Sequence, residues 1–208
     1  MLSFPFINEL FTAVLTESAA IQGRLYVCPK YGAEINSDNF DQVLKDYVEG
    51  NIFPKRYPVA LMMPPRVVGD FQNPSEWDRY NISIYFLKQS YVDSENQVQD
   101  PNQAGTSQHT IEMDWHDMKR VAVGFVRALS AINRNTVGMA KLWRMPGTDK
   151  TISPVSFTGV DQAAGVKLEF QIHVFPGCEA EDISEDSYEA LSTTISALST
   201  DSHPIHSL

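Results

Sequence analysis

The sequence predicts an α+β protein built on an antiparallel sheet, and three observations carry that prediction. Residues 80–91 and 166–175 alternate between apolar and polar side chains, which indicates strands with one buried face. Residues 114–133 instead place apolar side chains along one helical stripe. The strand candidates pair locally and the helices stand apart from them, which favours α+β over a parallel α/β sheet.

The N-terminal part predicts a helix, a short strand and a second helix. Residues 3–22 carry apolar side chains at i, i+3 and i+4 spacing, and Gly23 is expected to end this helix. Residues 24–28 follow as a strand that a proline stops, and residues 39–48 form a short amphipathic helix.

The two central strands are expected to form an antiparallel pair. The apolar segment between Pro54 and Pro65 is bounded by prolines, which cannot donate to a sheet ladder and therefore mark strand ends or an edge. Residues 80–91 supply its partner. The connection over residues 66–79 is longer than a hairpin needs, and the polar residues 93–108 predict an exposed, mobile loop.

The long helix over residues 114–133 has Asp114 as its candidate N-cap and Asp117 in its first turn, where a carboxylate is favoured. Gly124 inside it indicates either close packing against a neighbour or simple tolerance. Residues 154–160 then pair with residues 166–175 as a closing hairpin. In the last strand the inward residues are Val166, Leu168, Phe170, Ile172 and Val174, and the outward ones are Lys167, Glu169, Gln171 and His173.

The charge of the chain divides it into two parts. The 208 residues carry a net charge of −10, and residues 179–208 hold seven acids and no lysine or arginine. The remaining 26 − 7 = 19 acids stand against 16 bases, so residues 1–178 carry only −3. We therefore predict a one-domain body over 1–178 and an acidic C-terminal extension over 179–208. Groove binding of nucleic acid needs a cluster of Lys and Arg, and none appears in the sequence.

The chemistry-bearing residues do not form a recognisable active site. No phosphate-loop, dinucleotide-binding, serine-hydrolase or zinc-protease motif occurs, so we predict no catalytic residue, no cofactor and no metal. Asp114 and Asp117 are interpreted as a cap and a solvated charge. His116 and Asp117 point about 100° apart on a helix and cannot converge on one substrate atom. A ligand role for outward-facing His173 needs a partner that the sequence does not identify, and spacing is weak evidence for metal at His203 and His206.

The two cysteines, Cys28 and Cys178, are single thiols beside proline or glycine turns. A reduced, cytosolic compartment is the simpler interpretation, and a disulfide between them stays open if the two strand ends meet. No local signature supports Cys28 as a nucleophile. Neither a basic leader nor a run of about 18 apolar residues occurs, so no targeting segment and no membrane span are expected.

Partner-binding candidates come from two kinds of pattern. Trp77 and Trp143 stand beside charged residues in predicted loops, a setting in which indoles serve interfaces or anchor their own domain. The acidic extension carries apolar residues at helix-like spacing, which suits ordering on a neighbour as well as a disordered, solubilising tail. These residues are Tyr188, Leu191, Ile195 and Leu198.

The order of elements resembles the head–tail joining, tail-completion and tail-terminator proteins of tailed bacteriophages. The matching segments, FINELFTAVL, YPVALMMPP with YNISIYFLKQ, DMKRVAVGFVRAL, and SPVSFTGV with VKLEFQIHVF, cover roughly residues 1–176. The helix over residues 39–49 and the acidic extension depart from the family outline.

This resemblance implies a non-catalytic subunit that forms cyclic, often six- or twelve-fold rings. Its partners would be further copies of itself and portal, connector or tail-tube subunits. DNA would pass through the lumen without sequence-specific binding, and the protein would belong to the virion after assembly in the host bacterial cytoplasm.

Two other interpretations stay open at the level of sequence. One is an adaptor or assembly subunit of a contractile-injection or secretion system. The other is a small-ligand binding module with a pocket lined by Tyr26, Tyr57, Tyr80 and Tyr85.

Overall fold

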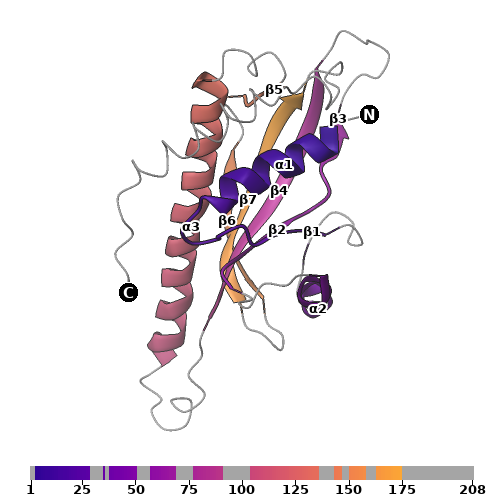
Figure 1. Cartoon of the computed structure of the whole chain (residues 1–208). Coiled ribbons are helices and arrows are strands. Elements are labelled where there is room, and N and C mark those ends of the chain that lie inside the picture. The colour runs from indigo at the N-terminus through magenta and orange to yellow at the C-terminus, as the bar shows by residue number, and fades with distance from the viewer. Residues whose placement is uncertain are drawn as a thin grey trace.

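Three helices and seven strands make up the described part of the chain in a computed structural model (Figure 1). The described residues are 3–28, 35, 38–50, 57–68, 77–90, 104–135, 143–146, 150–157 and 163–174. The helices are α1 (Ser3–Thr16), α2 (Phe40–Gly50) and α3 (Ala104–Asn135). The strands are β1 (Leu25–Val27), β2 (Val59–Met62), β3 (Arg66–Val68), β4 (Asp78–Gln89), β5 (Trp143–Arg144), β6 (Thr151–Phe157) and β7 (Ala163–Val174). The predicted α+β class is confirmed.

All seven strands belong to one mixed sheet of order β1-β2-β4-β7-β5, with β3 beside β4 and β6 beside β7. The predicted antiparallel pairs are present as β2 with β4 and β6 with β7. They are joined because β4 and β7 pair antiparallel along their whole length, from Asp78 opposite Val174 to Gln89 opposite Ala163. The prediction of a purely antiparallel sheet is wrong, since β1 runs parallel to β2. In the sequence, the segment that contains α2 connects β1 to β2 and supplies the long crossover that a parallel pair needs.

One face of the sheet is covered by α1 and α3 (Figure 1), and the main core lies between this face and the two helices. The predicted inward residues of β7 and the alternate residues Tyr80, Ile82, Ile84 and Phe86 of β4 all belong to this core. Phe125 of α3 occupies its centre, with ring centroids 5.2 Å from Phe11 and 5.7 Å from Phe86. Burial of the apolar stripes on both helices is therefore what holds them to the sheet.

The opposite face is covered over only part of its area, where α2 packs on it. A second core forms there from α2, β2, the later residues of β4, the end of β6 and the start of β7. Within it, Phe40 stacks on Phe157 with centroids 4.5 Å apart. Tyr85 and Leu87 of β4 are buried in it, so the expectation of one buried face fails for that end of the strand. Tyr80 lies in the main core whereas Tyr26, Tyr57 and Tyr85 belong to the second, so the four tyrosines do not line one pocket.

Two helix boundaries differ from the prediction. The first helix stops at Thr16 rather than at residue 22, and Gly23 (φ 76°) instead closes a turn in which its amide donates to the carbonyl of Leu15 at 2.8 Å. The long helix begins at Ala104, ten residues before Asp114, so both the exposed loop over 104–108 and the N-cap role of Asp114 are wrong. Residues 104–110 lack an apolar stripe, so periodicity does not reveal their helix.

Two further predictions change inside the connections. The segment between the central strands contains β3, which pairs with β4. Trp143 belongs to β5 rather than to a loop. The predicted loop over 93–103 and the extension over 179–208 lie outside the described residues.

Candidate functional site

The sheet face that α2 leaves uncovered is the candidate functional site, and we call it the open face. It is built from the outward positions of strands β3, β4, β7 and β5, because side chains alternate between the two faces of a sheet. The register sets these residues beside one another, with Arg66 opposite Asn81, Asn81 opposite Gln171, Ser83 opposite Glu169, and both Arg79 and Arg144 opposite His173. The open face comprises Arg66, Arg79, Asn81, Ser83, Arg144, Glu169, Gln171 and His173.

The middle of the open face is a polar surface with a shallow depression. Gln171 donates from Nε2 to Oδ1 of Asn81 at 2.9 Å, which ties β7 to β4 across the exposed side. The depression has a volume of about 270 Å³, and Arg66, Ser83 and Glu169 are among the residues that line it. An open, shallow depression of this kind suits contact with another chain better than enclosure of a small molecule.

Three arginines give the open face its charge. Arg66, Arg79 and Arg144 are all exposed, and within the described ranges none of them lies within ion-pair distance of a carboxylate. Glu169 is already paired with Lys167, whose Nζ lies 3.0 Å from Oε1. The face is therefore positive on a chain whose net charge is −10. The sheet thus brings together three arginines that are separated in the sequence.

Arg144 organises one end of the open face. Its guanidinium lies 4.8 Å from the ring centre of Trp77, and its Nε donates to Nδ1 of His173 at 3.2 Å. Because Nδ1 accepts a hydrogen bond, the proton of the neutral imidazole is on Nε2. Nε2 is buried and has no hydrogen-bond partner in the described part of the chain. Burial, together with the charges of Arg144 and Arg79, lowers the pKa of His173.

This geometry selects one class of ligand group. The exposed guanidinium groups of Arg79 and Arg144, both opposite His173, favour an anionic group, because a carboxylate or phosphate oxygen accepts hydrogen bonds from either arginine. The partner that the sequence could not identify for His173 is Arg144, which donates to its Nδ1.

Comparisons of the chain with protein-family models, with curated proteins and with solved structures find no match. Within the described ranges, no three His, Cys, Asp or Glu residues gather as metal ligands would. No described helix is long and apolar enough to cross a membrane.

The structure places the predicted partner-binding residues in different environments. Trp77 lies beside the open face in contact with Arg144, and its interface role stays a prediction. Trp143 is fully buried in the main core, so an interface role for it is wrong, because strand β5 turns its indole inward while Arg144 turns outward. Tyr188, Leu191, Ile195 and Leu198 lie outside the described residues.

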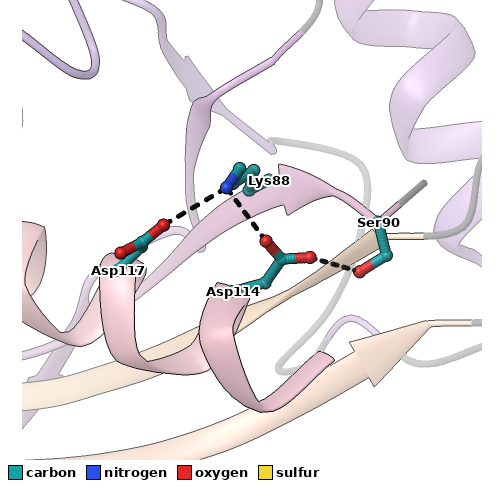
Figure 2. A network of polar contacts seen from close by, with 4 residues as sticks. All are labelled: Lys88, Ser90, Asp114 and Asp117. Atoms are coloured by element: carbon teal, nitrogen blue, oxygen red, sulfur yellow. Dashed lines mark hydrogen bonds and ion pairs between the residues drawn. The ribbon is translucent and has the colours of Figure 1, made fainter. Parts of the chain in front are cut away.

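Asp114 and Asp117 of the long helix have a structural role that the sequence did not suggest (Figure 2). Asp114 is 3% exposed, accepts a hydrogen bond from the Ser90 hydroxyl at 2.6 Å and lies 3.0 Å from Nζ of Lys88. Asp117 lies 3.2 Å from the same Nζ. Burial alone would lower the pKa of Lys88, but its hydrogen bonds and ion pairs with the two carboxylates outweigh burial and raise that pKa. The three charged groups therefore fasten α3 to β4, and Asp114 is neither a cap nor solvated.

Cys28 is a buried thiol of the second core. Burial, with a smaller contribution from Asp46, raises the pKa of the Cys28 thiol to about 12. A thiol of that pKa carries almost no thiolate near neutral pH and is a poor nucleophile. Its partner in the open disulfide question, Cys178, lies outside the described residues.

We expect Cys28 to react with iodoacetamide in the native protein roughly 1,000-fold more slowly than in urea, because the pKa rises from 9.0 to about 12. The measurement is a mass-spectrometric time course at pH 8 in a Cys178→Ser background, so that Cys28 is the only thiol. Equal rates in native and unfolded protein would contradict the buried position.

Proposed function

We propose that this protein is a non-catalytic ring subunit of a bacteriophage head-to-tail connector or tail, of the tail-completion or tail-terminator type. In that role it binds further copies of itself and neighbouring portal, connector or tail-tube subunits, and DNA passes through the ring without sequence-specific binding. The protein then resides in the virion after assembly in the host cytoplasm.

The observation that carries the proposal is the open face. A sheet face that no described helix covers, with three exposed arginines and a shallow central depression, suits a macromolecular partner. The acidic extension gives the same chain a second surface of opposite charge. Two different surfaces on one chain are what a heterologous, ring-forming contact requires.

The positions of the chemistry-bearing groups support a structural role. The carboxylates of Asp114 and Asp117 are engaged by Lys88, and the Cys28 thiol is held in its neutral form inside a core. These groups stabilise the fold, which leaves the surface residues of the open face for binding.

We expect the purified protein to form rings and expect deletion of residues 179–208 to weaken association far more than folding. The body contains the sheet and both cores, whereas the extension adds charge and a short apolar pattern. Mass photometry and electron micrographs of the full-length and truncated proteins measure association, and thermal melts recorded in parallel measure folding. A full-length protein that stays monomeric at all concentrations, with no rings in micrographs, would rule out the proposal.

A further inference from the structure

The open face and the acidic extension have complementary charge. Arg66, Arg79 and Arg144 are exposed cations without a carboxylate partner in the described part of the chain. The extension has seven acids and no lysine or arginine, and six of the acids fall within residues 179–189. They are Glu179, Glu181, Asp182, Glu185, Asp186 and Glu189.

Strand β7 ends beside the open face. Strand β7 ends at Val174, the residue after His173, and 208 − 174 = 34 residues follow it. An extended chain spans about 3.3 Å for each residue, so Glu179 and Glu189, which follow Val174 by 5 and 15 residues, can lie as far as roughly 17 and 50 Å from it. That reach allows residues 179–189 to contact the open face of an adjoining copy.

We propose that the open face of each copy binds residues 179–189 of a neighbouring copy. This proposal rests on the proposed function, since it supplies the contact that joins successive subunits of a ring. The contact is heterologous, with the face of one copy against the extension of another, so that identical contacts repeat around the ring until it closes.

The geometry of the face fits carboxylates in particular. An arginine fork binds the two oxygens of a carboxylate through parallel hydrogen bonds, which a single lysine cannot do. Arg79 and Arg144 both lie opposite His173, on the strands that flank this end of β7. One carboxylate placed between these two arginines would accept hydrogen bonds from their guanidinium groups and offset their charge.

Two full-length charge-reversed variants test this contact. The face variant carries Arg66→Glu, Arg79→Glu and Arg144→Glu, and the extension variant carries Glu181→Lys, Asp182→Lys, Glu185→Lys and Asp186→Lys. A matched control reverses three exposed cations on α3 instead, through Lys119→Glu, Arg120→Glu and Arg127→Glu. Thermal melts establish that each variant is folded, and mass photometry over a concentration series gives the association constants.

We expect each variant alone to associate at least about ten-fold more weakly than the wild type, because like charges then meet at the contact. The α3 control should associate as the wild type does. Mixing the face variant with the extension variant should restore association, since each then meets an oppositely charged surface on the other.

The remaining outcomes overturn the inference in distinguishable ways. A wild type that never associates removes the proposed function itself. A wild type that forms rings while the face variant does so equally well removes only this contact. Loss of association in both variants without rescue on mixing means that the extension does not reach a neighbour. If the face variant keeps its rings but loses binding to a DNA duplex, the face is a phosphate site instead.

Discussion

Replacement of Lys88 by methionine is expected to destabilise the protein by about 3 kcal/mol, among the largest effects of any single change outside the aromatic core. The methionine leaves Asp114 buried at 3% exposure without the ammonium group that now lies 3.0 Å away. The Ser90 hydroxyl still donates to Asp114, but one neutral hydrogen bond does not compensate a buried carboxylate. The cost falls at the lower end of the range for breaking a buried pair because the Lys88 side chain is 41% exposed.

Urea unfolding of four proteins measures this contribution. They are the wild type, Lys88→Met, Asp114→Asn and the double variant, which together form a double-mutant cycle. We expect the double variant to be more stable than Lys88→Met, because its asparagine needs no counter-charge and can still bond to Ser90. Asp117→Asn serves as the control and should cost less than about 1 kcal/mol, since Asp117 is 45% exposed. A Lys88→Met protein within 0.5 kcal/mol of the wild type, roughly the limit of the method, would contradict this account.

Sequence patterns could predict the helices and strands that have one buried face and one solvent-exposed face. The alternation of Val166 to Val174 fixes both the strand and its inward residues, and the stripe from Met118 to Ile132 fixes the helix, because burial and periodicity agree there. The same logic fails at Tyr85, whose outward position is buried by α2, a helix distant in sequence.

The role of Asp114 could not be predicted because a carboxylate before an apolar stripe has the pattern of a helix cap. The helix extends ten residues further toward the N-terminus, and those residues include a polar segment without apolar periodicity. The carboxylate consequently lies in mid-helix, where Lys88 and Ser90 from the neighbouring strand surround it. Local sequence patterns do not show which residues of another strand the fold brings next to a side chain.

The open face depends on register between strands that lie far apart in the chain. Arg66, Arg79 and Arg144 come from three strands, and strand β5 has only two residues, too few to show a period. The outward positions of Glu169, Gln171 and His173 were predictable from the alternation of β7. Their neighbours become visible only once the sheet is assembled.

Substitution of Gly165 by alanine is expected to destabilise the protein by about 3 kcal/mol, the upper end of the range for overpacking. A methyl group at this position would overlap the backbone oxygen of Phe86 and lie 2.9 Å from its carbonyl carbon and 3.0 Å from Cα of Leu87. Gly165 pairs with Leu87 on one side and with Val155 on the other, so strand β7 is held from both sides and cannot move away. Close approach of two backbones therefore requires glycine here.

Gly124→Ala is the matched control, and its effect should have the opposite sign. Gly124 lies in the interior of α3 with no atom within 4 Å of the added methyl group, which corresponds to simple tolerance rather than close packing. Alanine is favoured over glycine in a helix, so this variant should be more stable by about 0.5–1 kcal/mol. Urea unfolding of both variants beside the wild type gives the two differences. If Gly165→Ala were as stable as the wild type, β4 and β7 could not approach as closely at Phe86 as the structure places them. If Gly124→Ala lost stability, the exposed face of α3 would have to be packed against something.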